Sequence, residues 1–150
     1  MTSKCTRPDL VAAEKMELEH GRLWRAAGPQ TATVGELYYR KRGISLDVWP
    51  GALRFHPKVW HNPSQCCHPA ILAQTLCNGR LAVYAIFLAP DGLNRANLRH
   101  TTAAIEAELG SSVLLQSGSD NVVVVGDGIE TMLSVMIMYP RYRTSTIVAV

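Results

Sequence analysis

The stretch that decides the fold is Val122-Val123-Val124-Val125-Gly126-Asp127-Gly128-Ile129-Glu130-Thr131-Met132-Leu133-Ser134-Val135. Its run of valines is typical of a strand that is buried on both faces. The apolar segment from Ile129 to Met138 then predicts a helix. An acid at the carboxyl end of a central parallel strand, as Asp127 would be, lies at the binding edge of the sheet, next to the N–H groups that begin the following helix.

Two helices are predicted nearer the N-terminus. Residues 8–27 are rich in Ala, Glu, Leu, Lys and Arg, which are good helix formers. Thr33 and Glu36 have the spacing of a capping box, so we expect a second helix over residues 34–42. Gly43 is suited to the C-terminal cap of that helix.

The middle of the chain alternates between strand and turn signals. Residues 70–76 and 81–88 predict two strands, and Asn78-Gly79 between them is a strong signal for a β-hairpin. Pro90-Asp91-Gly92 predicts a turn that ends the hairpin. The remaining expectations are strands at residues 52–56, 112–116 and 144–150, a loop at 62–67, and a helix from Thr101 or Thr102 to Glu108.

Length and composition indicate a single globular unit. The chain has 150 residues, of which 47% are hydrophobic and 18% charged, and this is enough apolar material for a core. No apolar run reaches the roughly 18 residues that a membrane span needs, and the N-terminus does not resemble a signal peptide. We therefore expect a soluble protein of the host-cell cytoplasm without membrane contact, with its four cysteines as reduced thiols.

The positive charge is concentrated in the first third of the chain. Up to Ile44 there are eight basic and five acidic residues, a net charge of +3, and the rest of the chain has seven of each. A basic region of this kind attracts nucleic acid. The alternative is an ordinary solvated helix face.

Several blocks along the chain resemble, in the same order, the toprim-type primase-like proteins of phages and plasmids. The stretch from Val122 to Val135 is similar to the glutamate motif of their toprim fold. The resemblance covers about residues 23–150 and implies a part in DNA replication. The other blocks are Leu23-Trp24-Arg25-Ala26-Ala27, Tyr39-Arg40-Lys41-Arg42-Gly43-Ile44, Leu53-Arg54-Phe55-His56-Pro57, Pro69-Ala70, and Leu88 to Gly92.

The metal site that the resemblance implies is incomplete. In toprim proteins one glutamate and a later Asp-X-Asp pair hold Mg²⁺, which stabilises phosphate charge. Here Asp127 takes the place of the glutamate, none of the 23 residues after it is Asp, and Glu130 is the one acid among them. We therefore expect a protein without catalysis, in which Asp127 and Glu130 bind Mg²⁺ weakly or are simply solvated at a helix start. The family's lysine after the Asp-Gly turn is replaced, and Arg95 is the candidate for its place.

The candidate nucleic-acid contacts lie mainly on the second predicted helix. Tyrosine rings stack on bases and basic side chains contact phosphates, although tyrosines on a helix often pack on the core instead. A separate group, His61, Cys66, Cys67 and His68, contains zinc-ligand types without a paired ligand spacing, and a thiol nucleophile there lacks an orienting carboxylate. The candidate nucleic-acid-binding residues are Tyr38, Tyr39, Arg40, Lys41, Arg42 and Arg54.

Together these features predict an α+β fold in one compact unit. It comprises N-terminal helices (residues 1–44), an antiparallel hairpin region (45–118) and a truncated toprim-like α/β half-sheet (119–150). We expect the strand at residues 144–150, or its neighbour, to be an exposed apolar edge, which a second copy or a partner protein would cover.

Two functions from different classes follow. The first is a primase-derived protein of a phage or mobile element that binds nucleic acid without catalysis. The second is a small phage protein that binds and inhibits a host protein complex, such as a CRISPR–Cas or other defence system. A third reading is a fragment of a working enzyme whose Asp-X-Asp lies on other sequence.

Overall fold

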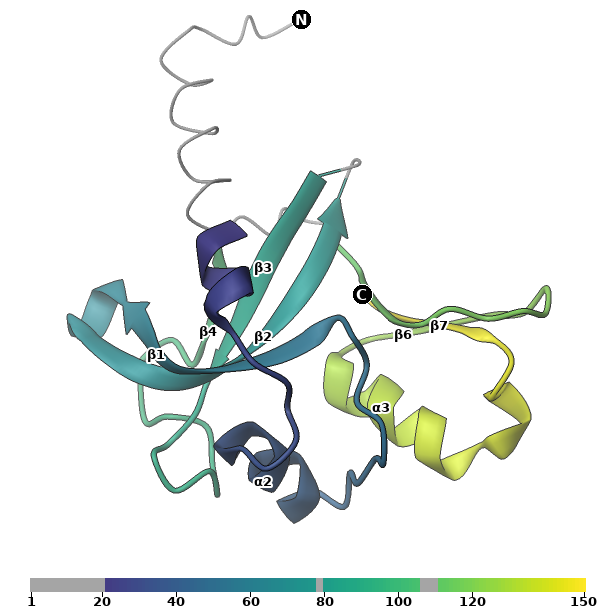
Figure 1. The fold of residues 1–150 in the computed structure, drawn as a ribbon, viewed down its shortest axis with the longest axis horizontal. Helices are drawn as coiled ribbons and strands as arrows, with labels where there is room; N and C mark the ends of the chain where they lie inside the picture. The colour runs from purple at the N-terminus through teal and green to yellow at the C-terminus, as the bar shows by residue number, and fades with distance from the viewer. Residues whose placement is uncertain (1–20, 78–79, 106–110) are drawn as a thin grey trace, which may run out of the picture.

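The computed structural model describes residues 21–77, 80–105 and 111–150, and it has the predicted α+β architecture (Figure 1). Residues 21–26 are helical and precede the first labelled helix. The labelled elements are α2 (Val34–Lys41), β1 (Leu53–His61), β2 (Cys66–Cys77), β3 (Arg80–Phe87), β4 (Thr102–Ile105), β5 (Val113–Gln116), β6 (Val123–Gly126), α3 (Ile129–Met138) and β7 (Thr146–Ala149), with short 3-10 turns η1 (Asn62–Ser64) and η2 (Pro140–Tyr142).

The larger sheet is a four-stranded antiparallel sheet in the order β1-β2-β3-β4. The predicted hairpin is confirmed by the pairing of β2 with β3 up to Cys77 and Arg80, while its Asn78-Gly79 turn lies outside the described residues. β1 and β2 are longer than the sequence indicated, while β3 has the expected length and is displaced by one residue. In particular, β2 begins at Cys66, inside the segment expected to be a loop, because Cys66 and Cys67 pair with the end of β1.

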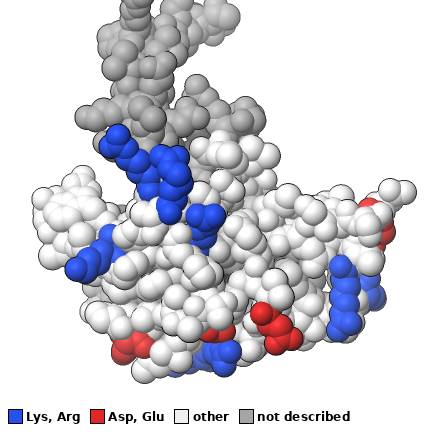
Figure 2. Space-filling view, in the orientation of Figure 1, with Lys and Arg blue, Asp and Glu red and all other residues white. Residues whose placement is uncertain are grey.

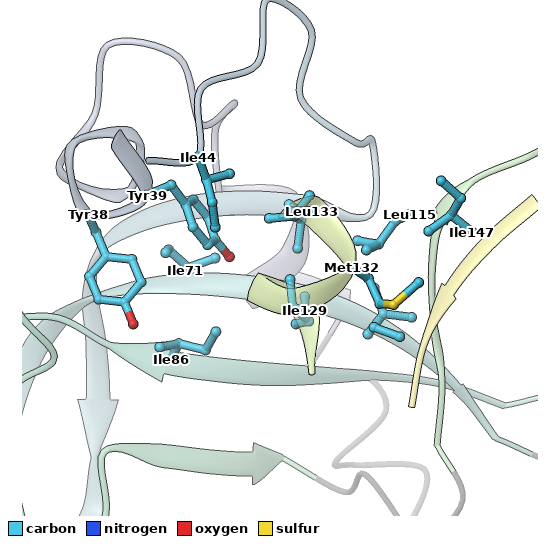
Figure 3. Packing of buried hydrophobic residues seen from close by; sticks show 14 of the residues in the cluster. Tyr38, Tyr39, Ile44, Ile71, Ile86, Leu115, Ile129, Met132, Leu133 and Ile147 are labelled. Atoms are coloured by element: carbon cyan, nitrogen blue, oxygen red, sulfur yellow. The ribbon is translucent and has the colours of Figure 1, made fainter. Parts of the chain in front are cut away.

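Both faces of this sheet are buried. Side chains alternate along a strand, so Ile71 and Ala73 of β2 face one hydrophobic core while Ala70 and Leu72 face another. The larger core also takes residues from α2, α3, β5 and β7, and Figure 3 shows these side chains gathered around α3. It therefore includes residues from all three segments into which the sequence was divided.

The smaller sheet has three strands in the order β5-β7-β6, with β5 antiparallel and β6 parallel to β7. Two expectations are corrected here. The valine strand β6 is not buried on both faces: it is an edge strand, and Val123 and Val125 are 62% and 58% exposed. The last strand, β7, is not an edge but the centre of the sheet, with Ile147 and Ala149 buried. The exposed apolar edge is its neighbour, β6.

The helix expected from Thr101 or Thr102 to Glu108 is also corrected. Residues 102–105 form β4, which pairs with β3 from Val83 to Ile86. Pairing with the open edge of β3 satisfies the backbone of this segment, and this tertiary contact overrides a local helix preference. Residues 106–110 lie outside the described residues.

The predicted α2 is confirmed, with its caps. The Thr33 hydroxyl accepts from the N–H groups of Gly35 and Glu36, which satisfies donors that a helix start leaves free. The Glu36 carboxylate reaches back to the N–H of Ala32, one residue earlier than a standard capping box. Gly43 follows the helix with φ +75°, as its predicted capping position requires.

Gly92 gives a test of the turn that the sequence predicted at Pro90-Asp91-Gly92. Its φ is +69°, and an added Cβ would lie 2.8 Å from the backbone oxygen of Val34. Gly92→Ala should therefore lower the free energy of unfolding by at least about 1 kcal/mol, measured by urea denaturation. Gly51→Ala is the matched control, because no atom lies within 4 Å of its added Cβ. Equal stability of the two variants would contradict the prediction.

Candidate nucleic-acid interface

Three segments far apart in the sequence meet at one charged cluster. Tyr38 and Arg42 come from α2, Arg95 from the loop after β3, and Glu130 from the first turn of α3. The Tyr38 hydroxyl donates to Glu130 Oε1 at 2.5 Å, and Arg95 Nη2 donates to the same oxygen at 3.0 Å. Arg95 Nε also donates to the Tyr38 hydroxyl at 2.9 Å. We call these four residues the Glu130 cluster.

Arg42 closes the other side of the cluster. Its Nε lies 3.6 Å from Glu130 Oε2, and its guanidinium lies over the Tyr38 ring, 3.7 Å from the ring centre. A cation over an aromatic face is attracted by the ring's electron density. Because Arg42 immediately precedes the Gly43 cap, the way α2 ends places this guanidinium beside α3.

The cluster stabilises the ionised form of Glu130. Burial by itself would raise the pKa of this carboxyl group, but hydrogen bonds from Tyr38 and Arg95 and the charges of Arg95 and Arg42 outweigh it and lower the pKa. Burial and the bond to Glu130 raise the pKa of Tyr38. The hydrogen bond to Tyr38 raises the pKa of Arg95 further. Tyr38 therefore stays neutral near pH 7, while Glu130 and Arg95 stay ionised.

Positive charge exceeds negative charge here. Two guanidinium groups face one carboxylate, and the side chains of Arg42 and Arg95 are 31% and 39% exposed. Arg40 and Lys41 add two more cations at the same end of α2, where Arg40 pairs with Glu36 at 3.0 Å. Lys41 is exposed and makes no ion pair with any described residue. These four cations exceed the two acids, Glu36 and Glu130, by two positive charges.

Two of the predicted nucleic-acid contacts are corrected. Tyr38 and Tyr39 are both 0% exposed, so their rings are not available to stack on bases. Tyr39 packs against Trp49 with ring centres 5.2 Å apart, and against Tyr38 edge-on at 5.5 Å. Both tyrosines pack in the larger core, which is the alternative that the sequence left open.

Arg54 has a structural role in the described chain. Its guanidinium lies 4.6 Å from the centre of the Trp24 ring, and its Nη1 donates to the backbone oxygen of Trp24 at 2.9 Å. These contacts tie the helical residues 21–26 to β1. Of the predicted contacts, Arg40, Lys41 and Arg42 are therefore the ones that the structure groups with Arg95.

The structure argues against a Mg²⁺ site shared by Asp127 and Glu130. Both oxygens of Glu130 face arginine side chains, whose charge repels a divalent cation. Asp127 is exposed at the end of β6, and the described residues contain no group of three His, Cys, Asp or Glu that could hold a metal. A metal ion at Glu130 would therefore have to displace both arginines from the carboxylate.

The histidine and cysteine group has a structural arrangement. His61 is buried, and its ring lies near the Ser64 hydroxyl (2.8 Å) and the backbone oxygen of His100 (3.1 Å). The Ser64 hydroxyl also lies 3.1 Å from His68 Nε2. Cys66 and Cys67 are exposed free thiols. These contacts fix the turn η1 between β1 and β2, and they explain why histidines occur there.

Sequence reasoning identified Arg95 only as the candidate for the place of a family lysine. It did not predict that Tyr38, Arg42 and Arg95 meet at Glu130. It also missed the run Tyr139-Pro140-Arg141-Tyr142-Arg143 after α3, in which all residues except Tyr142 are exposed. Interleaved aromatic and basic residues in this run were a signal that could have been found. Figure 2 shows Lys and Arg side chains in several separate groups on this face, so the basic residues do not form one continuous band there.

The fold and the cluster define a small α+β protein with a cation-rich surface site. Residues 14–115 match the family described as "Domain of unknown function (DUF7146)", and the chain belongs to this family. The match includes the part of the Glu130 cluster on α2 and Arg95, and it ends before Glu130. No curated protein and no solved structure matches the chain. Within the described ranges, no helix has the length and apolar character of a membrane span.

Proposed function

We propose that this protein is a non-catalytic, primase-derived binding protein of a phage or mobile element that contacts nucleic acid. The observation that carries the proposal is the meeting of Arg42 and Arg95 at a single carboxylate, beside Arg40 and Lys41. Two of the blocks that resemble toprim-type primase-like proteins supply Arg42 and Glu130, and Arg95 is the candidate for the place of the family's lysine. Phosphate oxygens are the natural partners of exposed guanidinium and ammonium groups.

The cluster is suited to a phosphate backbone rather than to one particular base. Glu130 fixes the two guanidinium groups in place, so less side-chain entropy is lost when an anion binds. Tyr38 also holds the cluster in place, because its hydroxyl is hydrogen-bonded to both Arg95 and Glu130. Guanidinium groups pair with phosphate oxygens through two parallel hydrogen bonds, and contacts to phosphate carry no sequence information.

The same arrangement supports binding without Mg²⁺-dependent catalysis. The carboxylate of Glu130, in the first turn of α3, faces two arginines instead of being open to a metal. Asp127→Ala is therefore expected to leave nucleic-acid binding unchanged. Binding in the presence and absence of Mg²⁺, measured by fluorescence anisotropy, should agree.

The first test is anisotropy with labelled single-stranded DNA, duplex DNA and RNA over a salt series. We expect micromolar or tighter binding at low salt that weakens as salt rises, because phosphate contacts release counterions. Lys41→Gln should lower the slope of log affinity against log salt by about 1. Lys41 is exposed, so this change leaves the fold intact.

Lys58→Gln is the matched control. It removes one exposed cation from β1, outside the cluster, and is expected to keep the salt slope of the unchanged protein. Equal slopes for all three proteins would place the contact elsewhere and overturn the role of α2. Absence of any binding at low salt would overturn the proposed function itself.

A second candidate function is binding and inhibition of a host protein complex, such as a CRISPR–Cas or other defence system. The observation that favours it is the exposed β6, whose outer edge pairs with no described strand and whose valines face solvent. Edges of this kind accept another strand from a second copy or a partner. Val123→Lys should then abolish partner binding or dimerisation, measured by light scattering and co-purification, and should leave nucleic-acid binding intact.

A further inference from the structure

The turn after α3 gathers aromatic and basic side chains on the surface. The guanidinium of Arg141 lies to one side of two neighbouring tyrosine rings, 5.3 Å from the centre of the Tyr139 ring and 4.8 Å from that of Tyr142. The two ring centres are 6.2 Å apart. Tyr139 remains 42% exposed, although Arg141 lies against its ring. The ring is thus held in place and still open to solvent.

The backbone makes this arrangement rigid. The N–H of Tyr139 donates to the oxygen of Val135, and that of Tyr142 donates to the oxygen of Tyr139. The Gln116 side chain donates to the backbone oxygens of Tyr142 and Ser145, which fastens the turn to β5. A platform that is rigid before binding loses little entropy when a ligand stacks on it.

The charge of this surface is positive. Arg141 and Arg143 are exposed, and neither makes an ion pair with a described residue. The nearby acid is Asp120, whose two oxygens already accept hydrogen bonds from the Val122 N–H and from the Thr144 and Ser145 hydroxyls. Figure 2 shows Lys and Arg side chains on the right of this face, where Figure 1 draws the turn after α3.

We infer that this turn is a second nucleic-acid contact that prefers single strands, with a base stacked on Tyr139 and the backbone held by Arg141 and Arg143. Unpaired bases expose their faces to aromatic side chains, whereas bases in a duplex are already stacked. Arginine beside the ring adds a cation for the phosphate on the same strand. This inference rests on the proposed function, since it assigns the substrate class of the same binding activity.

The Glu130 cluster and this turn lie at opposite ends of α3. Glu130 is on the first turn of α3 and Tyr139 is its C-terminal cap. A helix rises 1.5 Å per residue, so the two sites lie roughly 14 Å apart along α3. Nine residues at 3.6 residues per turn are two and a half turns, so helix periodicity places the two positions on opposite sides of α3, and each contact is tested separately.

The test compares Tyr139→Ala with Tyr139→Phe and the unchanged protein by anisotropy on a single-stranded DNA and on a duplex of the same sequence. Tyr139→Ala should weaken single-strand binding at least about fivefold and change duplex binding much less. Tyr139→Phe keeps the ring and should bind as the unchanged protein does. Arg143→Gln should lower the salt slope by about 1 without changing the thermal midpoint.

Each outcome decides between defined alternatives. If the unchanged protein binds and Tyr139→Ala and Arg143→Gln bind equally well, the second contact is wrong and the proposed function stands. Equal losses on single strand and duplex would overturn the single-strand preference. If the unchanged protein binds neither the single strand nor the duplex, the proposed function fails as well. Matching thermal midpoints of the Ala and Phe variants exclude a loss that comes from unfolding.

Discussion

Tyr39→Ala is expected to lower the free energy of unfolding by about 3–5 kcal/mol, the range for removing a large buried aromatic side chain. The ring is 0% exposed and packs against Trp49 and Tyr38, so its loss leaves a cavity in the larger core. That core joins α2, the four-stranded sheet and α3. Urea denaturation followed by tryptophan fluorescence measures the change.

Tyr39→Phe separates the ring from its hydroxyl. The buried Tyr39 hydroxyl has no hydrogen-bond partner among the described residues, and burial raises the pKa of this group. An unsatisfied buried hydroxyl destabilises a fold, so its removal should leave stability equal to or above that of the unchanged protein. A loss in Tyr39→Phe as large as in Tyr39→Ala would show that the hydroxyl, and not the packing of the ring, carries the stability.

Glu130→Gln is the second change with a large expected effect, a loss of about 1.5–3 kcal/mol at pH 7. The substitution keeps the size of the side chain and removes the charge that Arg42 and Arg95 face. Two half-exposed guanidinium groups are then left without a counter-charge. Asp127→Asn is the control: its carboxylate is exposed, so its loss should change stability by less than about 0.5 kcal/mol.

The effect of Glu130→Gln should depend on pH. The folded protein lowers the pKa of Glu130 below its ordinary value, so the ionised group stabilises the fold above the unfolded-state pKa of about 4.3. This contribution is lost as the pH falls through the lower pKa of the folded state. Urea midpoints of the two proteins should therefore differ most at pH 7 and approach each other as the pH falls below the ordinary pKa of Glu. A difference that stays constant over this range would contradict the role of the charge.

Local signals in the sequence were enough to predict several elements. The Thr33 cap, the Gly43 stop and the Pro90-Asp91-Gly92 turn depend on contacts within a few residues, and all three are found. The order of strands in the smaller sheet depends on partners far along the chain instead. Four successive valines predict a strand correctly, but they do not tell an edge from a centre.

The candidate site was predicted only in part for the same reason. Arg42 and Glu130 were both identified, but as members of separate sites with different ligands. Tyr38 and Glu130 are 92 residues apart in sequence, and only the packing of α2 against α3 brings them together. The helix pattern could not show which side of α2 is covered, so the tyrosines were expected on a surface that the fold buries.

The central place of β7 has a consequence for the growing chain on the ribosome. β5 and β6 each pair with β7 and not with each other, so neither has its partner until the residues of β7 have been added. At about 5–20 residues per second, the valines of β6 wait a second or more after they are synthesised. A short β-branched, uncharged segment in that condition is prone to aggregate. The yield of folded protein should therefore respond to chaperones that bind extended apolar chain.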